Sequence, residues 1–240
     1  MTDRVAAWIR DAERMVVLTG AGISAESGVP VFRGPSGLWR QFRPEDLATP
    51  EAFTRQPQLV WEWYGWRREQ IAKAQPNEGH RAIVRLERRR PGVTVLTQNV
   101  DGLHQRAGTV RPAELHGSLW RVRCAEGCGF VTTDGESDPP RDCFRCACGS
   151  WLRPDVVWFG EPLDPDVLER ATAAAEEADV VVVVGTSAVV YPVAALPQMA
   201  RRRRAKVVEV NVAPTPLSGE ADAVLRGTAS AMLLAVEQQL

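Results

Sequence analysis

All five cysteines of this 240-residue chain lie in one short stretch, at a spacing that could bind a metal ion. Cys124 and Cys128 form a C-x3-C pair, and Cys143, Cys146 and Cys148 offer the second half of a site. Four thiolates around a tetrahedral zinc ion leave no open position for catalysis, so a zinc ion here would be structural. An odd, clustered set of cysteines also favours a reducing compartment over a disulfide framework.

The loop Gly20–Gly22 follows the apolar run Met15–Thr19 directly. Glycine after a buried strand lets the backbone approach a ligand closely, and a helix that starts there offers free N–H groups to a phosphate. The loop lacks the full G-x-G-x-x-G fingerprint, and a tight turn between strand and helix is the alternative. Farther along, Phe32 and Arg33 predict a mobile loop that carries an aromatic ring and a cation to a bound cofactor.

Three polar side chains follow the apolar run Val93–Thr97, at the end of the next expected strand. Ligands of α/β sheets bind at the carboxyl ends of the strands. Gln98 and Asn99 can donate and accept hydrogen bonds, and Asp101 adds a carboxylate, a set that suits an amide and ribose hydroxyls. Helix capping by Asn99 or Asp101 is the alternative, but capping alone explains three such residues poorly.

His116, in the sequence ELHGS, is the candidate general base among the three histidines His80, His104 and His116. The ordinary pKa of histidine lies near neutrality, which suits a group that accepts a proton during catalysis. A lone histidine is more often structural. The position of His116 just before the cysteine-rich segment favours the catalytic interpretation.

Tyr64 and Arg67 are three residues apart in a segment expected to be helical over residues 58–73, so they share one helix face. A guanidinium and a phenol at this spacing could hold a carboxylate with several hydrogen bonds. The alternative is a surface of aromatic and cationic side chains together with Trp61, Trp63 and Trp66. From the spacing alone, the alternative is favoured.

Short apolar runs that alternate with helical stretches must position these residues. The runs Met15–Thr19, Val93–Thr97, Val156–Phe159, Val180–Val184 and Lys206–Val210 predict buried parallel strands, with a weaker one at Ala223–Leu225. Helices are expected over residues 3–13, 78–89, 164–178, 192–204 and 229–239. This alternation predicts an α/β fold with a doubly wound, Rossmann-like parallel sheet.

Two segments interrupt that alternation and predict a smaller module. Residues 34–77 are rich in Trp, Pro and Arg, and residues 123–154 contain every cysteine. We therefore expect a Rossmann-like domain formed by residues 1–33, 78–122 and 155–240. The small domain would combine a helical insert, 34–77, with a zinc-binding insert, 123–154.

The composition excludes several classes of protein. With 29 Lys and Arg against 30 Asp and Glu, the net charge is −1, which disfavours a nucleic-acid binder. Hydrophobic residues at 45% and charged residues at 25% are typical of globular proteins and not of disordered chains. No apolar run reaches membrane-spanning length, and the first residues lack the apolar core of a secretory signal. We expect a cytoplasmic protein without nucleic-acid or membrane partners.

Five motifs occur in the order typical of one family. They are GAGISAESGVPVFRG (20–34), TQNVDGLH (97–104), ELHGS (114–118), LRPDVVWFGE (152–161) and VVGTSAVVYP (183–192). The chain thereby resembles the sirtuins, NAD-dependent protein-lysine deacylases, over nearly its whole length. The resemblance implies that NAD and an acyl-lysine protein or peptide meet between the two domains of a monomer. It also implies that His116 is the general base, and that nicotinamide and O-acyl-ADP-ribose are released.

The resemblance further assigns residues to ligands. It implies that NAD is bound by Gly20, Ala21, Gly22, Glu26, Phe32, Arg33, Trp39, Gln98, Asn99, Asp101, Gly185, Thr186, Ser187, Asn211, Val212, Ala213 and Ala229. Val157, Phe159 and Gly160 match the segment that pairs with the substrate peptide as an added β-strand. Val31 departs from the family, which commonly has Thr or Asp at this position.

The Tyr64-x-x-Arg67 pair resembles that of class III sirtuins, in which it recognises succinyl- and malonyl-lysine. With this resemblance, the carboxylate-binding interpretation becomes the better one, and succinyl and malonyl groups are expected to be preferred over acetyl. An NAD-dependent protein ADP-ribosyltransferase with the same NAD pocket is the alternative function.

The family's usual C-x2-C-G-G pattern leaves the third zinc ligand open. Cys148 fits the fourth ligand, but the pattern would place the third at Arg145, which cannot bind zinc. Either Cys143 or Cys146 must replace it. Because a C-x-C pair crowds two ligands into very little chain, we expect Cys124, Cys128, Cys143 and Cys148 to bind zinc, with Cys146 as the spare.

Overall fold

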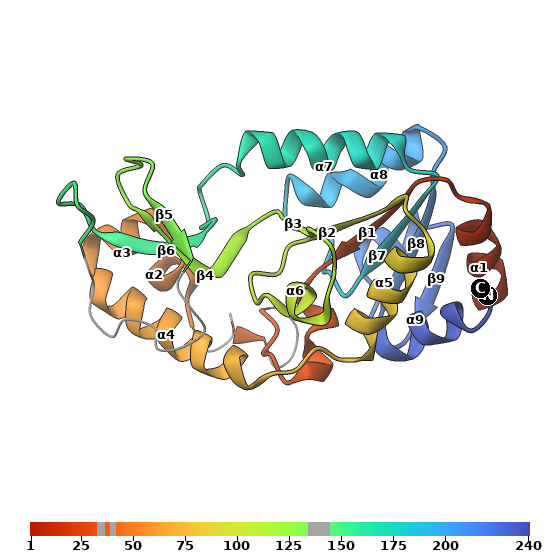
Figure 1. Ribbon diagram of the computed structural model, residues 1–240, viewed down its shortest axis with the longest axis horizontal. Helices are drawn as coiled ribbons and strands as arrows, with labels where there is room; N and C mark the ends of the chain where they lie inside the picture. Colours follow the sequence, from red (N-terminus) through yellow and green to blue (C-terminus); the bar gives the residue numbers. More distant parts are fainter. Residues whose placement is uncertain (33–36, 39–41, 134–144) are drawn as a thin grey trace.

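The structure, a computed structural model, describes residues 1–32, 37–38, 42–133 and 145–240 (Figure 1). Its larger sheet has parallel strands in the order β3-β2-β1-β7-β8-β9. These strands span Ala113–Glu114 (β3), Val93–Thr97 (β2), Met15–Thr19 (β1), Val180–Val184 (β7), Lys206–Asn211 (β8) and Ala223–Arg226 (β9). The predicted Rossmann-like parallel sheet is confirmed.

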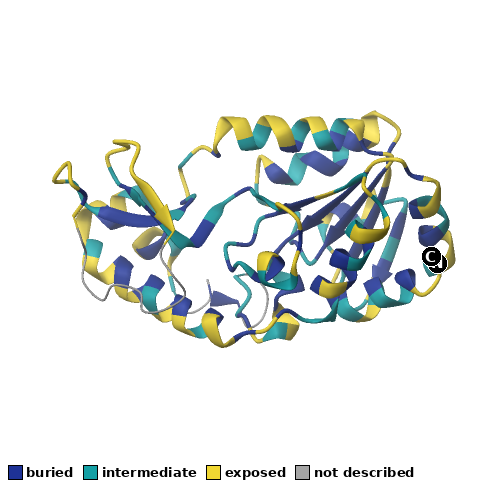
Figure 2. Cartoon of the chain, in the orientation of Figure 1, coloured by how far each residue is buried: buried dark blue, intermediate teal, exposed yellow. Residues whose placement is uncertain are grey.

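Unbroken apolar runs form the middle of this sheet because helices cover both of its faces. Alternate residues of a strand point to opposite faces. Val17 and Val182 contact a layer made of α1 (Thr2–Asp11), α5 (Glu78–Arg89) and α9 (Ala229–Glu237). Leu18 and Val183 contact the opposite layer, made of α7 (Pro165–Glu177) and α8 (Leu196–Arg202). Figure 2 shows the strands buried between helices whose outer faces are exposed.

A second, antiparallel sheet belongs to a smaller module at the other end of the molecule (Figure 1). Its strands are β5 (Val131–Thr133), β4 (Gly117–Cys124) and β6 (Leu152–Val156), in the order β5-β4-β6. Helices α2 (Pro44–Leu47), α3 (Pro50–Arg55) and α4 (Pro57–Lys73) share an aromatic core with this sheet. In that core the Trp61 indole N–H donates to the Leu152 carbonyl oxygen at 2.9 Å. The predicted boundaries of the two domains stay a prediction.

Short elements complete the described chain. They are α6 (Leu103–Ala107) and the 3₁₀ turns Ala21–Ile23, Ala25–Ser27, Val193–Ala195 and Pro216–Gly219. Among the helices of the described residues, none is both long enough and apolar enough to cross a membrane.

The prediction of a parallel strand over residues 156–159 is wrong. The strand lies earlier, in β6, and pairs antiparallel with β4 in the small sheet. Beyond it, the Trp158 amide donates to the Glu161 carboxylate at 2.8 Å and the Phe159 amide to the Ala48 carbonyl oxygen at 2.9 Å. Trp158 is therefore buried by side-chain packing and not by strand pairing, whereas Phe159 is exposed, and the pattern of hydrophobic residues alone cannot distinguish these cases.

Two histidines are buried together where α5 and α6 meet the larger sheet. The rings of His80 and His104 are edge to face, with centroids 5.0 Å apart, and both residues are almost fully buried. Burial, which penalises the charged form, lowers the pKa of His80 to about 3 and that of His104 to about 4. Both rings are therefore neutral in the folded protein near neutral pH.

These histidines should make stability depend on pH. In the unfolded chain they bind protons near pH 6.5, whereas in the folded chain they do so only at much lower pH. The free energy of unfolding should therefore fall as the pH is lowered from 6.5 towards 4. His104→Leu should flatten that dependence by up to about 1.4 kcal/mol per pH unit, measured by urea unfolding between pH 7.5 and 5.

Leu103→Ala is the matched control, because Leu103 is the buried neighbour of His104 on the same helix and does not titrate. This variant should be less stable at every pH but should keep the wild-type pH dependence. An unchanged slope in His104→Leu would contradict the prediction.

Candidate active site

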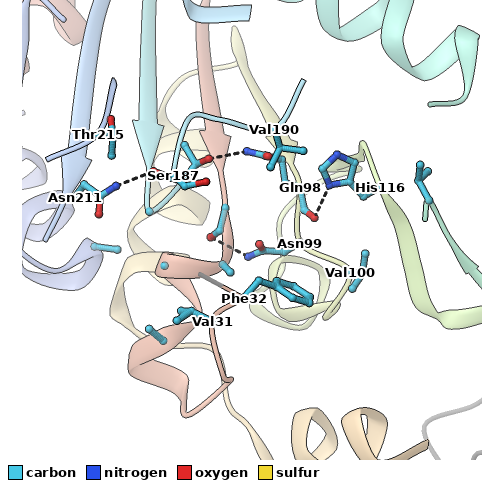
Figure 3. Close-up of a pocket in the computed structure, with 18 of the residues that line it drawn as sticks. Val31, Phe32, Gln98, Asn99, Val100, His116, Ser187, Val190, Asn211 and Thr215 are labelled. Carbon is cyan, nitrogen blue, oxygen red and sulfur yellow. Dashed lines mark hydrogen bonds between the residues drawn. The ribbon is translucent and has the colours of Figure 1, made fainter. Parts of the chain in front are cut away.

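A cavity of about 700 Å³ lies between the larger sheet and the small module (Figure 3). Its floor is formed by the segments that follow the carboxyl ends of β1, β2 and β7 and by the end of β8. The strand order reverses between β1 and β7, and α/β sheets bind their ligands at such a switch point. The fold therefore places most of the predicted cofactor residues around one cavity.

Glycines in the floor allow two loops to touch. The Gly22 amide donates to the Gly185 carbonyl oxygen at 2.7 Å. A Cβ atom on Gly22 would lie 2.7 Å from the Gly185 backbone, so no other residue fits without a shift. Gly185 also has a φ of 61°, in the left-handed region that favours glycine. The predicted helix after Gly20–Gly22 is a short 3₁₀ turn, and here the glycines serve contact between loops.

Gln98 and Asn99 line the cavity and are held by the neighbouring loops (Figure 3). The Gln98 amide group donates to the Thr186 hydroxyl at 3.0 Å, and that of Asn99 donates to the Gly20 carbonyl oxygen at 3.2 Å. These contacts fix both side chains before any ligand binds, which reduces the entropy lost on binding.

Asp101 does not line the cavity but lies behind it. Its carboxylate accepts from the Ser24 hydroxyl at 2.7 Å and from the Leu103 amide at 2.9 Å. Burial raises the pKa of Asp101 above its ordinary value. Ser24 in turn accepts from the Asn99 amide group at 3.2 Å. Asp101 thus orients Asn99 through Ser24 and also accepts from the first amide of α6, whose N-cap residue is Gly102 and has no side-chain cap.

His116 presents a basic nitrogen in a defined tautomer. Its Nδ1 lies 3.2 Å from the Gln98 carbonyl oxygen, which can only accept (Figure 3). Nδ1 must therefore hold the proton, and the neutral ring leaves its lone pair on Nε2. Burial lowers the pKa of His116, and the bond to Gln98 offsets only part of that effect. This geometry suits a general base.

The remaining predicted cofactor residues lie mostly along the same cavity. Its lining includes Gly20, Ala21, Gly22, Glu26, Phe32, Gly185, Thr186, Ser187, Asn211, Val212, Ala213 and Ala229. The Asn211 amide group donates to the Thr186 carbonyl oxygen at 2.8 Å, which joins β8 to the loop after β7. Arg33 and Trp39 lie outside the described residues.

The small module brings Tyr64 and Arg67 of α4 to the opposite wall of the cavity. Both are buried, with 5% and 4% of their surface exposed. The Arg67 guanidinium lies over the Phe32 ring, 4.4 Å from its centroid, and 5.2 Å from the Trp63 centroid. Burial raises the pKa of Tyr64 to about 12 and lowers that of Arg67 to about 10. At neutral pH the phenol is therefore protonated and the guanidinium charged.

The predicted peptide-binding residues Val157, Phe159 and Gly160 also line the cavity. They follow β6 at the junction of the two sheets, where the Val157 amide donates to the His116 carbonyl oxygen at 2.9 Å. This bond places the segment beside the candidate base.

Sequence reasoning missed two residues that the site depends on. Ser24, which links Asp101 to Asn99, lies inside the motif that begins at Gly20 and was passed over as part of a loop. Trp158, which lines the cavity and donates from its indole N–H to the Tyr64 hydroxyl at 2.8 Å, was assigned to a strand. The motifs contained both residues, but only the three-dimensional contacts show what they hold.

Four cysteines meet at the far side of the small module, and their positions correct one expectation. The sulfur atoms of Cys124, Cys128, Cys146 and Cys148 all lie within 4.8 Å of one another. The distances Cys124–Cys148 and Cys128–Cys146 are both 3.5 Å. Tetrahedral zinc with Zn–S bonds of ~2.3 Å needs sulfur atoms ~3.8 Å apart, so the set fits zinc. Cys146 is therefore not the spare cysteine.

Cys143, which was expected to be the third ligand, lies outside the described residues. The turn Cys146–Gly149, in which the Gly149 amide donates to the Cys146 carbonyl oxygen at 2.8 Å, lets Cys146 and Cys148 face the same point. A tight turn thus removes the crowding that had counted against a C-x-C pair.

Comparison with known proteins gives consistent matches over most of the chain. A family model described as "Sir2 family" matches residues 20–192. An NAD-dependent protein deacylase of Aquifex aeolicus is 54% identical over 227 residues, which cover 94% of this chain and 95% of that protein. NAD-dependent protein deacylase 2 of Pyrobaculum aerophilum is 52% identical over 231 residues, 95% of this chain and 92% of its own.

Solved structures match equally well. A mutant Sir2 homologue in complex with ADP-ribose has a TM-score of 0.95 and 47% identity, covering 100% of this chain and 96% of its own. A Sir2 homologue in complex with NAD has a TM-score of 0.92 and 48% identity, and the match covers 99% of this chain and 93% of that chain. A Sir2 complex with a p53 peptide and NAD+ has a TM-score of 0.87 and 32% identity, covering 100% and 98%.

The zinc ligands can be tested directly. Cys146→Ser should lose the bound zinc and lower the melting temperature, because a zinc ion contributes folding free energy to a module with little core around it. Cys143→Ser is the matched control and should keep one zinc per chain. Metal analysis and thermal unfolding, with and without a chelator, give the answer. Zinc loss from Cys143→Ser instead, or equally from both variants, would contradict the assignment.

Proposed function

Because the chain belongs to the Sir2 family, we propose that it is an NAD-dependent protein-lysine deacylase that prefers succinyl and malonyl groups over acetyl. Relatives named NAD-dependent protein deacylase, about half identical over most of the chain, support the deacylase activity. The observation that supports the acyl preference is the environment of Arg67.

Arg67 is a buried cation with an unused donor. Among the described residues, its Nη1 has no hydrogen-bond partner, although Arg67 lines the cavity. A buried donor left unpaired costs about 1–3 kcal/mol, and more for a charged group. An acyl chain that ends in a carboxylate would satisfy this donor and neutralise the charge, whereas a neutral acetyl group would leave both uncompensated. One charge-assisted bond of ~1.5–3 kcal/mol corresponds to roughly ten- to a hundredfold discrimination.

The other end of the cavity suits NAD. With NAD bound, its ribose would take over the acyl group after nicotinamide has left, and water would release the free lysine. The products would then be nicotinamide, unmodified lysine and O-acyl-ADP-ribose. Gln98 and Asn99 offer donors and acceptors to an amide or to ribose hydroxyls. His116 would take a proton from a ribose hydroxyl at Nε2, directly or by relay. Exclusion of water from the cavity would prevent early hydrolysis until the acyl group has moved.

Protein ADP-ribosylation is the alternative, because the same NAD pocket could serve it. The cavity wall with Tyr64 and Arg67 supports an acyl substrate instead, because a carboxylate on the acyl group would accept hydrogen bonds from both side chains. Mass spectrometry of the products separates the two functions, because deacylation gives O-acyl-ADP-ribose and transfer gives an adduct on the acceptor protein.

We also propose that the protein acts on acyl-lysine peptides in the cytoplasm. A cluster of four thiolates that binds zinc is typical of a reducing compartment, which supports this location.

Arg67→Met tests the acyl preference. It should abolish desuccinylation and leave deacetylation largely intact, because only the dicarboxylic acyl group uses the guanidinium. Rates with succinyl, malonyl and acetyl peptides, with and without NAD, provide the measurement. Arg68→Met is the matched control: Arg68 is equally buried on the same helix but does not line the cavity, so its loss should leave the ratio of the two activities unchanged. Parallel loss of both activities in Arg67→Met would show that Arg67 serves folding or catalysis instead.

His116→Ala tests the general base. The variant should bind NAD and peptide but lose turnover. Because burial lowers the pKa of His116, the wild-type ring stays neutral below pH 6.5, and kcat/KM should decline only as the pH falls through that lowered pKa. Calorimetric binding and a pH–rate profile are the measurements. Substantial residual deacylation in His116→Ala, or an acid limb above pH 6.5, would remove His116 from this role.

A further inference from the structure

Trp158 lies beside the wall that carries Tyr64 and Arg67. It follows β6, lines the cavity, and has only 3% of its surface exposed. Its indole N–H donates to the Tyr64 hydroxyl oxygen at 2.8 Å in a buried hydrogen bond. We infer that Trp158 is a positioning residue that aims the Tyr64 O–H at the carboxylate of the acyl group. This inference rests on the proposed function.

The direction of the hydrogen bond carries the inference. An indole N–H can donate but not accept, so the Tyr64 oxygen must be the acceptor in this pair. The hydroxyl hydrogen is then free for another acceptor, and no described residue accepts it. Burial keeps the phenol protonated, since it raises the Tyr64 pKa to about 12. Tyr64 is therefore held as a donor at any working pH.

Two donors consequently lie in the lining of one cavity. Tyr64 and Arg67 are three residues apart on α4 and share a helix face. The phenol O–H and the Arg67 Nη1 both lack an acceptor within the described part of the chain. A carboxylate has two oxygen atoms and can accept from both, whereas the methyl group of acetyl-lysine can accept from neither. Without the indole N–H, the phenol oxygen could turn a lone pair towards the pocket and repel a carboxylate.

The indole itself is held on several sides. The Arg153 guanidinium lies over its ring, 3.3 Å from the centroid, and forms an ion pair with Glu161 at 2.5 Å. Glu161 also accepts from the Trp158 backbone amide at 2.8 Å. Phe53 packs against the ring with centroids 5.3 Å apart. Because these contacts are already made in the free protein, orienting Tyr64 costs little when the substrate binds.

Trp158→Phe removes the N–H but keeps an aromatic ring for Arg153 and Phe53. The ratio of kcat/KM for succinyl over acetyl peptides should fall about threefold to tenfold, the range expected for one lost hydrogen bond. Most of the change should be a higher KM for the succinyl peptide. Trp66→Phe is the matched control: Trp66 lies on the same helix as Tyr64 but does not line the cavity, so the ratio should hold.

A double-mutant cycle separates positioning from packing. If Trp158 acts through the phenol, Tyr64→Phe alone should also lower the ratio, and adding Trp158→Phe to it should lower the ratio no further. An additive second loss, or an unchanged ratio in Trp158→Phe, would overturn the inference. Should Trp158→Phe melt below the assay temperature, Tyr64→Phe alone decides, and an unchanged ratio there overturns it.

Wild type and Arg67→Met, assayed in the same series, keep the two proposals distinguishable. A succinyl preference that Arg67→Met abolishes but Trp158→Phe retains would overturn the role of Trp158 alone. Absence of any succinyl preference in the wild type would overturn the acyl preference, and the role of Trp158 with it.

Discussion

The close contact between Gly22 and Gly185 is the constraint on which the rest of the site depends. The loops after β1 and β7 meet where the strand order of the sheet reverses. There the Gly22 amide nitrogen lies 2.7 Å from the Gly185 carbonyl oxygen. Only residues without a Cβ atom allow this approach. Once the loops touch, Thr186 lies within reach of Gln98, and Gly20 within reach of Asn99. Two hydrogen-bonded loops and two amide side chains thus form one rigid floor.

The small module covers this floor and changes its electrostatics. Burial favours the uncharged forms of His116 and Tyr64, whereas Arg67 keeps its charge because its pKa falls only to about 10. The cleft wall therefore presents one desolvated cation beside neutral donors. An anionic ligand group complements such a wall electrostatically. The helix α4, which carries Arg67, sets where that group would bind.

How much could be predicted from the sequence depended on what buries each residue. The strands β1, β2 and β7 were predicted with the bounds that the structure shows, because an unbroken apolar run in a parallel sheet has few alternatives. The run Val156–Phe159 had the same appearance, but only Val156 belongs to a strand, and aromatic packing buries Trp158 beyond that strand. An apolar run therefore predicts that its residues are buried, but it does not predict whether a paired strand or packed side chains bury them.

For the site residues too, sequence position could be predicted but contacts between distant residues could not. The motifs predicted Gln98, Asn99 and His116 as site residues, and all three line one cavity because each follows a strand or adjoins one. Asp101 was expected in the pocket but holds Ser24 behind it, a contact between residues 77 apart that no spacing reveals. The choice between Cys143 and Cys146 failed for a related reason, because a turn decides which sulfur atoms can face one metal.

Phe32 shows how the two halves of the cavity meet in a single contact. Its ring lies over the Arg67 guanidinium, and the Trp63 ring approaches the same cation. Attraction between a desolvated guanidinium and aromatic rings, on the order of 2 kcal/mol, offsets part of the cost of burying this charge before a carboxylate arrives. Phe32 belongs to the segment that follows the glycine loop of the floor, whereas Arg67 belongs to the small module. The group that selects the acyl chain is thus stabilised by the segment that borders the cofactor end, so any movement of that segment changes the environment of Arg67.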